Sequence, residues 1–444
     1  MPRHLRFSRL LICALFAASS GAVASQPVLL ISLDGLRPGD VLDAEKRQLN
    51  LPNLKRFVSA GTYASEVHGV LPTLTYPSHT TLLTGVSPAK HGIASNLTFD
   101  PLLKNQQGWY WYAEDIRIPT LWDAAHAKRL STANVHWPVS VGAQVDYNLP
   151  QIWRTGTADD RKLMNALSTP GLLGPMEKEL GPYADGIAET IEADETRARF
   201  AQRLIETRHP TFMTAYFTAL DHTQHQVGPD ALEAHAVLER LDAIVGRLTE
   251  AALKSDPTTI VAVVSDHGFA KLEHETNLAR AFIDAGLITF DDKGQVAHWD
   301  AEPWYGAGSA AIVLHDRGDA NTRNKVRDLL NRMAADAATG IDHIFDRGEI
   351  AKRNGNVEAD FYVTFKLGYQ MATDIKAPLV GPSKLRGMHG YDPTFPEMRS
   401  TFLIMGAGVP RARNLGAVDM RDIAPTLARY LEVSLSDAEG KPLL

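Results

Sequence analysis

The hydrophobic positions of the chain fall into short continuous runs that end at polar residues. Three such runs each end at an aspartate: residues 28–33 at Asp34, residues 212–220 at Asp221, and residues 259–265 at Asp266. Runs that are apolar throughout predict strands covered on both faces, which is typical of an α/β fold with a mainly parallel sheet and helices on both sides. Because ligands of such sheets gather at the carboxyl ends of the strands, we expect the three aspartates to converge.

Between these runs the spacing of apolar residues changes to that of helices. In residues 231–253, leucine, isoleucine and valine recur with the spacing of one buried helical face, at Leu238, Leu241, Ile244, Val245 and Leu248. From about residue 306 to 375 the pattern changes again, and it predicts a small inserted α+β subdomain with elements at 310–314, 325–334 and 359–367. The remaining core is then expected to comprise residues 25–305 and 376–444.

The first 24 residues have the features of a secretory signal peptide. Arg3, Arg6 and Arg9 precede an apolar stretch over residues 10–18, and the small residues at 22–24 suit a cleavage site. The only cysteine, Cys13, lies in that stretch, so the mature chain would have neither thiol nor disulfide. A lipid anchor at Cys13 is the alternative, but the bulky Ile12 before it argues against one. We expect a secreted protein, and a bacterial periplasm suits an exported chain without cysteine best.

Composition and charge narrow the classes of function. The 444 residues, 44% of them hydrophobic, are ample for a sizeable core. The net charge of −7 disfavours polymeric nucleic acid as a partner. No segment after the signal peptide approaches the roughly 20 apolar residues of a membrane span, so no membrane anchor is expected.

Residues 71–85 carry the first candidate for chemistry. Their sequence predicts a loop that turns into a helix ending at Gly85, with Thr75 at the start and Pro77 in the first turn. Unpaired backbone N–H groups at such a start attract an anion. The alternative is that Thr75 only caps the helix, as threonines in this position commonly do.

Acidic and histidine residues form a second set of candidates. Asp221 and His225 are four residues apart, Asp266 and His267 are adjacent, and His389 lies in a glycine-flanked loop. Carboxylate oxygens and neutral imidazole nitrogens are suitable zinc ligands. Each pair alone could be a surface ion pair or a capped turn, so the metal hypothesis depends on the whole set.

Taken together, these residues resemble the nucleotide pyrophosphatase/phosphodiesterase branch of the alkaline phosphatase superfamily. The resemblance extends from Pro27 to about Leu431, and its markers keep the family's order: Asp34-Gly35, Thr75-Tyr-Pro-Ser-His79, Thr84-Gly85, His91-Gly92-Ile93, Asn96, Asp221 with His225, Asp266-His267-Gly268 and His389-Gly390. It implies an alkaline phosphatase-like core. Two positions depart from the family's usual residues: Ser78 replaces asparagine and Gln224 replaces glycine.

The resemblance also implies a mechanism. One Zn²⁺ would be held by Asp221, His225 and His389, and a second by Asp34, Asp266, His267 and the Thr75 oxygen, with Mn²⁺ as an alternative metal. Two such ions, about 4 Å apart, can stabilise both the attacking and the leaving oxygen of a displacement. Thr75 would attack phosphorus to give a phosphothreonine ester, which water then hydrolyses. Asn96 would donate a hydrogen bond to a phosphate oxygen.

The substrate class is the least determined part of the prediction. The uncharged Asn96 suits a phosphodiester, and the resemblance suggests that a nucleotide base stacks between Tyr76 and Trp153. Both aromatic residues could instead belong to the core or the rim. The alternatives are a phosphomonoesterase, a phospholipid or choline-type diesterase, and a metal-binding scaffold without activity. His222 is a possible competitor of His225 as a ligand.

Overall fold

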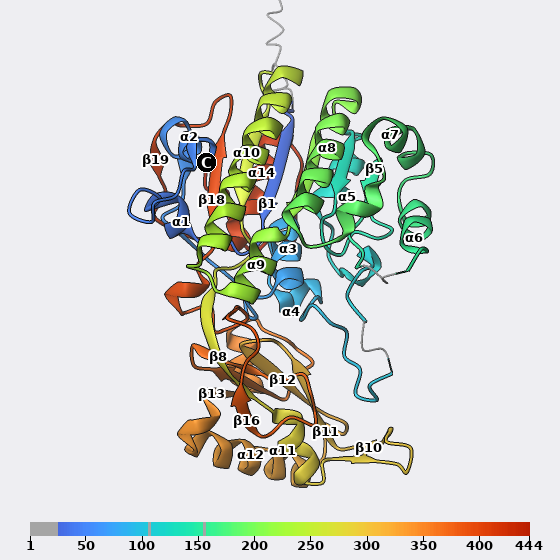
Figure 1. The fold of residues 1–444 in the computed structure, drawn as a ribbon, viewed down its shortest axis with the longest axis vertical. Helices are drawn as coiled ribbons and strands as arrows, with labels where there is room; N and C mark the ends of the chain where they lie inside the picture. The colour runs from blue at the N-terminus through green and yellow to red at the C-terminus, as the bar shows by residue number, and fades with distance from the viewer. Residues whose placement is uncertain (1–24, 105–107, 154–156) are drawn as a thin grey trace, which may run out of the picture.

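A computed structural model describes residues 25–104, 108–153 and 157–444 of the chain (Figure 1). The predicted signal peptide, with Cys13, lies outside these residues. The described chain has two parts: a large sheet flanked by helices, and a smaller antiparallel lobe below it in the view of Figure 1. No helix in the described ranges is both long and apolar enough to span a bilayer.

The large sheet has eight strands and is mainly parallel. Its order is β19 (Arg413–Asn414), β2 (Thr62–Tyr63), β18 (Phe402–Met405), β7 (Ile260–Val264), β1 (Val28–Leu33), β6 (Phe212–Phe217), β4 (Thr132–Val135) and β5 (Tyr147–Leu149). Strands β7, β1, β6, β4 and β5 are parallel to one another, whereas β18 runs antiparallel to both of its neighbours. The predicted fold class is therefore confirmed.

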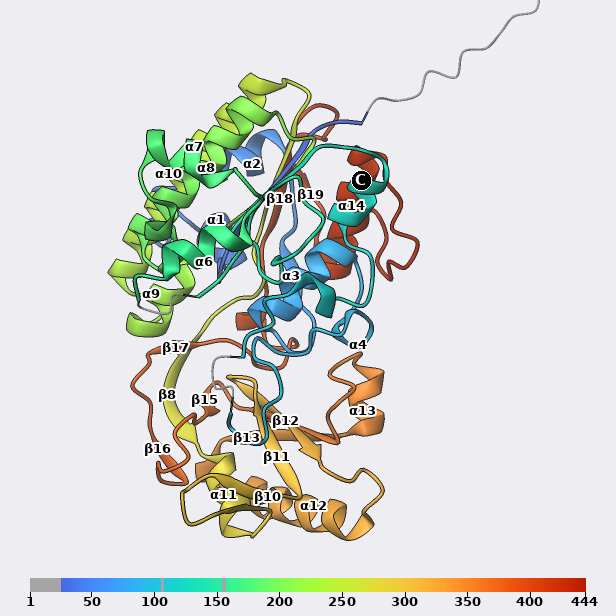
Figure 2. The same ribbon diagram turned by 90° about the vertical axis from the view of Figure 1, so that its right-hand side faces the viewer.

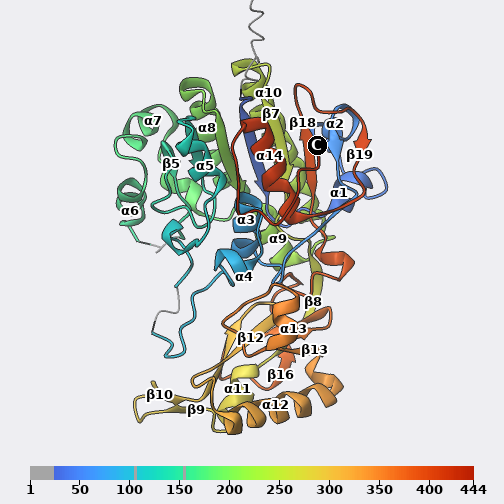
Figure 3. The same ribbon diagram turned by 180° about the vertical axis from the view of Figure 1, so that it is seen from behind.

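Helices cover both faces of this sheet, which explains why its strands are apolar throughout. In β1, Leu29, Ile31 and Leu33 pack on one side, and Val28 and Leu30 pack on the other. Figure 2 shows the two helical layers; the first contains α1 (Pro38–Leu42), α2 (Pro52–Ala60), α6 (Asp160–Leu167), α7 (Leu173–Leu180), α8 (Ile191–Arg208) and α10 (Leu232–Ser255). The second layer, in front in Figure 3, contains α3 (Thr75–Thr84), α5 (Leu121–Ala127) and α14 (Ile423–Leu431), with the short α4 (Pro88–His91) beside α3.

The antiparallel lobe is built on a second sheet with its own core. Its strand order is β11 (Ala301–Tyr305), β12 (Ser309–Leu314), β14 (Phe361–Phe365) and β13 (Ile341–Asp346). The other elements of this part are α11 (Leu278–Asp284), α12 (Ala320–Ala335), α13 (Arg347–Lys352) and the hairpin of β9 (Ile288–Phe290) with β10 (Val296–Trp299). The three predicted elements at 310–314, 325–334 and 359–367 correspond to β12, α12 and β14. The predicted subdomain boundaries at 306 and 375 stay a prediction.

Two paired segments cross between the two parts. Strand β8 (Ala270–Thr276) leaves the core three residues after His267, and β17 (Gly387–Met388) returns directly before His389. Strand β17 pairs antiparallel with Ala270 and Lys271 of β8. Farther out, β8 also pairs with β15 (Gly368–Met371) and β16 (Val380–Pro382). The pairing brings two histidines together that are far apart in sequence.

One predicted run was wrong in its extent. Residues 212–220 do not form one strand: β6 ends at Phe217, and α9 (Ala219–Val227) begins two residues later. The turn is fixed by the buried carboxylate of Asp194, which accepts hydrogen bonds from the backbone N–H groups of Thr218 and Ala219. Asp221 therefore lies in the first turn of a helix. The predicted helix over 231–253 is confirmed as α10.

Candidate active site

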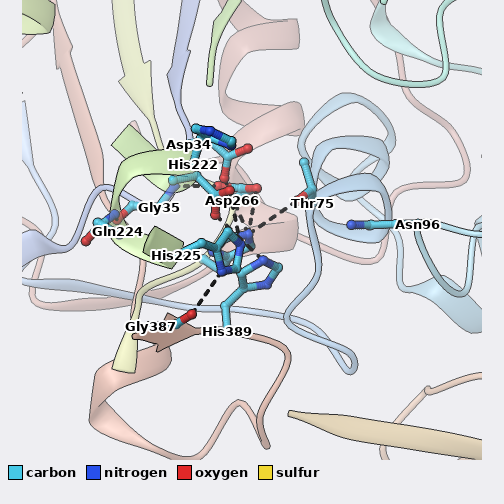
Figure 4. A network of polar contacts seen from close by, with 12 residues as sticks. Asp34, Gly35, Thr75, Asn96, His222, Gln224, His225, Asp266, Gly387 and His389 are labelled. Carbon is cyan, nitrogen blue, oxygen red and sulfur yellow. Dashed lines mark hydrogen bonds and ion pairs between the residues drawn. The ribbon is translucent and has the colours of Figure 1, made fainter. Parts of the chain in front are cut away.

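The three aspartates converge at the carboxyl ends of the central strands, as predicted. Asp34 follows β1, Asp266 follows β7 and Asp221 lies in α9 after β6, and all three side chains are buried. Figure 4 shows Asp34, Asp266, His225 and His389 of the cluster. Ion-pair contacts connect Asp221 with His225 and His389, and His267 with Asp34. The cluster thus gathers carboxylates and imidazoles at one edge of the sheet.

Two groups of potential metal ligands can be distinguished within the cluster. In the first, Oδ2 of Asp221 lies 3.3 Å from Nε2 of His225, and its Oδ1 lies 3.6 Å from Nε2 of His389. In the second, Nε2 of His267 lies 3.4 Å from Oδ1 of Asp34 and 3.1 Å from Oδ2 of Asp266. The ligand atoms of Asp221, His225 and His389 lie within 4.8 Å of one another, and so do those of Asp34, Asp221 and His267. Asp221 therefore borders both groups.

Hydrogen bonds fix the tautomer of all three histidines. Nδ1 of His225 lies 2.9 Å from the carbonyl of Gly387, Nδ1 of His267 lies 3.0 Å from that of Gly268, and Nδ1 of His389 lies 3.1 Å from that of Thr73. A carbonyl oxygen only accepts, so each Nδ1 must carry a proton. In the neutral form that binds a metal, each ring directs the lone pair of Nε2 toward the carboxylates. Backbone contacts of this kind orient the histidine ligands of metal sites.

Three carboxylate oxygens of the cluster lack a hydrogen-bond donor among the described residues. These buried atoms are Oδ1 of Asp34, Oδ1 of Asp221 and Oδ2 of Asp266. Burial and the nearby carboxylates of Asp221 and Asp266 raise the pKa of Asp34 well above its usual range. Burial lowers the pKa of His389 to about 3, so this ring is neutral. Buried carboxylates that face imidazole lone pairs fit bound cations, and the donor set fits a divalent metal such as zinc.

Thr75 faces this cluster from the first turn of α3 (Figure 4). Its hydroxyl lies 3.4 Å from Nε2 of His267. The residue that caps α3 is Leu74, and the Thr75 side chain is the first inside the helix, so the capping alternative does not describe it. Behind Thr75, Nδ1 of His79 donates to the Thr75 carbonyl at 2.8 Å, and Ser32 donates to the other ring nitrogen at 2.8 Å. The buried His79 therefore holds the start of the helix in place.

Asn96 is oriented by the same helix. Its Oδ1 accepts the backbone N–H of Tyr76 at 2.9 Å, which leaves the two N–H bonds of its side-chain amide for another acceptor. Asn96 and Thr75 both line a cavity of about 340 Å³ together with Asp34, Asp221 and His225. His389 also lines this cavity, whereas the predicted ligands Asp266 and His267 are fully buried and do not line it.

The aromatic residues of this cavity are arranged differently from the expected sandwich. Tyr76 is 1% exposed, and its ring lies 5.3 Å from that of Trp109. Trp109 in turn lies 5.1 Å from Trp153, so it contacts both predicted rings. All three residues line the cavity. Trp109 was not predicted, although the aromatic-rich stretch 109–112 is a visible signal in the sequence.

The remaining candidates near the site have structural partners. Nδ1 of His222 lies 3.3 Å from a carboxylate oxygen of Glu189, and His222 belongs to neither ligand group. Nε2 of Gln224 donates to the carbonyl of Gly35 at 3.1 Å, while the Gly35 N–H donates to Asp266 at 3.2 Å. Gly35 has φ +69°, and a Cβ atom there would lie 2.9 Å from Gln224, so the turn after β1 requires glycine.

One further neighbour of the cluster was not predicted. The hydroxyl of the buried Tyr216 donates to Oδ2 of Asp34. Tyr216 lies on β6, whose continuous apolar run gave no sign that one of its side chains reaches the site. At position 78 this chain has serine where the family usually has asparagine. The Ser78 hydroxyl is buried without a hydrogen-bond partner among the described residues.

Comparison with known proteins agrees with this geometry. Residues 28–392 match the family described as "Type I phosphodiesterase / nucleotide pyrophosphatase". The chain belongs to this family. It is accordingly an enzyme of the phosphoric diester hydrolase class.

Relatives in the family are distant in sequence. An uncharacterized pyrophosphatase/phosphodiesterase of Schizosaccharomyces pombe is 23% identical, with 94% of this chain and 79% of the relative covered. The human bis(5'-adenosyl)-triphosphatase ENPP4 is 22% identical over 94% of this chain and 80% of its own length. Rat ectonucleotide pyrophosphatase/phosphodiesterase family member 1 is 28% identical, but only 55% of this chain and 24% of that protein are covered.

Solved structures of family members share the fold. Human ectonucleotide pyrophosphatase/phosphodiesterase 5 has a TM-score of 0.67 at 18% identity, with 94% of this chain and 97% of that chain covered. An inactive variant of the murine protein in complex with AMP has the same TM-score at 19% identity and covers 94% of this chain and 97% of that one. The likeness extends over both parts of the molecule.

Proposed function

We propose that this enzyme hydrolyses nucleotide phosphodiesters or pyrophosphates through a covalent phosphothreonine on Thr75, with two metal ions bound in the carboxylate–histidine cluster. One observation carries the proposal: three Nε2 lone pairs and three buried carboxylates surround the position that the Thr75 hydroxyl faces. A phosphomonoesterase or a choline-type diesterase on the same cluster is the alternative.

Each of the two ligand groups would hold one metal ion. Asp221, His225 and His389 would hold one ion, and Asp34, Asp266, His267 and the Thr75 oxygen would hold the other. Carboxylate and imidazole donors favour zinc, with manganese as the alternative. When bound, the metals supply positive charge for the oxygens of the displacement and acidify the Thr75 hydroxyl.

Thr75 performs the covalent step. The Thr75 hydroxyl releases its proton to solvent, and its oxygen forms a bond to phosphorus as the bond between phosphorus and the leaving oxygen breaks. The leaving oxygen takes up a proton from solvent. Water then attacks phosphorus: its OH stays on the released phosphate, and its other proton restores the Thr75 hydroxyl. The hydrogen bond from His79 to the Thr75 carbonyl keeps the first turn of α3, and with it the nucleophile, in a fixed position.

Charge at the cavity favours a diester over a monoester. Among the described residues that line it, none is a lysine or an arginine. The amide N–H of Asn96 would donate to a non-bridging oxygen, which is sufficient for the single negative charge of a diester. A monoester carries additional negative charge, and no lysine or arginine among the described lining residues would neutralise it.

The aromatic residues support a nucleotide as part of the substrate. Trp109 and Trp153 are partly exposed and line the same cavity as Thr75, so either ring can offer a face to a base. The AMP complex of a structural relative agrees with this class of ligand. Export to a bacterial periplasm is part of the proposal and rests on the sequence of residues 1–24.

Steady-state kinetics of the zinc-loaded mature protein test the proposal. The substrates are bis-p-nitrophenyl phosphate, the p-nitrophenyl ester of thymidine monophosphate, and p-nitrophenyl phosphate, measured side by side. A kcat/KM that is highest for the nucleotide ester is expected. A preference for the monoester would contradict the proposed preference for nucleotide diesters, but not the proposed metal cluster.

A matched pair of variants tests the role of the aromatic residues. Trp153→Leu and Trp109→Leu should raise KM for the nucleotide ester roughly 5-fold to 100-fold, because stacking on one base contributes about 1–3 kcal/mol. The same variants should leave bis-p-nitrophenyl phosphate nearly unaffected. Equal losses on both substrates would contradict base recognition.

A further inference from the structure

The antiparallel lobe contains a second cavity that the proposed reaction does not use. Its volume is about 450 Å³, which is in the usual range for a small-molecule site. It is lined by the loop after Asn96, by the edge strand β11, and by the segment after β15. The cavity is too large for a single ion and suits an organic molecule.

One buried carboxyl in this cavity has no partner. Glu302 of β11 is 7% exposed, and its Oε2 is buried without a hydrogen-bond partner among the described residues. Its cross-strand neighbour on β12 is the apolar Val313. Burial raises the pKa of Glu302 to about 8, with a further contribution from the carboxylate of Asp100. No positively charged or hydrogen-bond-donating group among the described residues therefore contacts the Glu302 carboxyl.

The other walls of the cavity complement a positive charge. Asp100 and Asp374 also line it, and no lysine, arginine or histidine does so among the described residues. The aromatic side chains of Phe99, Trp304 and Tyr305 complete the lining, and the rings of Phe99 and Trp304 lie 5.3 Å apart. Aromatic faces beside a carboxylate attract organic ammonium groups, whose charge is spread over apolar surface.

We propose that this cavity is a second ligand site, which binds a small organic ammonium cation between Glu302 and the aromatic side chains of Phe99 and Trp304. The cation supplies the positive counter-charge that is missing beside the Glu302 carboxylate, and its alkyl groups contact the apolar walls of the cavity. Because Leu97 and Tyr305 line both cavities, the ligand lies next to the phosphodiester site. The proposal does not depend on the phosphodiesterase activity, since no residue of the metal cluster lines the second cavity.

Isothermal titration calorimetry of the full-length mature protein tests the proposal, with choline as the probe. Its uncharged carbon isostere, 3,3-dimethylbutan-1-ol, has nearly the same shape. We expect choline to bind at least 10-fold more tightly than the isostere. Equal affinity for the two probes would overturn the proposal, because the cavity would then select shape rather than charge.

Variants locate the binding. Glu302→Gln keeps the size of the side chain and should weaken choline binding at least 10-fold, whereas binding of the isostere should not change. Phe99→Leu should weaken choline binding to a smaller extent. The matched control is Glu273→Gln on β8, a side chain that is 74% exposed, and it should leave choline binding unchanged. Choline affinity that is the same in Glu302→Gln and in the wild type would place the cation elsewhere and overturn the proposal.

Inhibition kinetics distinguish two sources of the cation. If the ammonium group belongs to the leaving arm of a substrate, choline should compete with a diester substrate. If the cation is a free ligand, choline should bind without raising KM. The two proposals fail independently. Absence of diester hydrolysis would contradict the proposed function, whereas absence of choline binding would contradict this second site.

Discussion

The buried carboxyls of the two parts of the molecule differ in what surrounds them. At the edge of the large sheet, each of three aspartates lies within 3.6 Å of a histidine Nε2, and further contacts from Tyr216 and Gly35 hold two of them. In the antiparallel lobe, Glu302 lies against apolar and aromatic side chains. We propose a cation for each place, and of the two only the first has several carboxylate and imidazole ligands that could enclose a metal ion.

This difference shows how the surroundings of a buried acid determine its partner. Several carboxylates with oriented imidazoles produce a compact, strongly charged site that suits a divalent ion. A single carboxyl among aromatic rings produces a weaker and larger site that suits a dispersed organic charge. Substitutions in the two parts should therefore differ in both size and kind of effect.

The largest effect is expected for the nucleophile. Thr75→Ala should lower diester hydrolysis by about 10³-fold or more, as removal of a covalent nucleophile does, while metal content stays the same. Thr80→Ala, one turn later in α3, is the matched control, because the Thr80 hydroxyl donates to the Tyr76 carbonyl of the same helix. Hydrolysis rates and metal analysis check both variants. A Thr75→Ala enzyme with unchanged turnover would disprove the assignment.

Metal content should distinguish the two ligand groups. Because Asp221 borders both groups, Asp221→Ala should reduce bound zinc to below one ion per chain, whereas His225→Ala should retain about one. Elemental analysis after gel filtration measures the ratio. His222→Ala serves as the control and should retain both ions. Loss of zinc from His222→Ala would show that this residue, and not His225, is the ligand.

A smaller effect is expected for the ion pair behind the site. Arg197 and Asp194 are both fully buried, lie 2.7 Å apart and hold the turn between β6 and α9. Asp194→Asn should lower the free energy of unfolding by about 3 kcal/mol, because it leaves the Arg197 charge buried and unpaired. Urea denaturation measures this change. Glu195→Gln breaks the exposed pair with Arg247 and should cost less than about 1 kcal/mol.

The smallest effect on stability is expected for Glu302, whose carboxyl has no hydrogen-bond or ion-pair partner among the described residues. At pH 5, Glu302→Gln should change the free energy of unfolding by less than about 1 kcal/mol, because no partner loses a contact. The raised pKa of Glu302 means that the folded state holds its proton more tightly than the unfolded state does, from the ordinary 4.5 up to about 8. Stability of the wild type should therefore fall, relative to the variant, as the pH rises from 5 to 8. Parallel pH curves for the two proteins would contradict this assignment of Glu302.

Much of the fold could be predicted because burial leaves a local pattern in the sequence. The apolar runs identified β1 and β7, and the helical spacing in residues 231–253 identified α10. The predicted extent of the run over 212–220 was wrong because a buried run has the same composition in a strand and at the start of a helix. The turn there depends on Asp194, about 25 residues away in sequence, and no local pattern reports such a contact.

By itself, the sequence determined which residue types were available and which local elements would carry them. It placed Thr75 at the start of a helix and three aspartates after apolar runs. Only the tertiary structure decided how their side chains meet. The pairing of β17 with β8 stacks His389 on His267 at 3.6 Å between ring centres, and the carbonyls of Gly387 and Thr73 fix two imidazole tautomers. The burial of Glu302 and the contact of Trp109 with Tyr76 are equally non-local. Such contacts depend on the packing of segments distant in sequence, whereas periodicity reports only which face of a segment is buried.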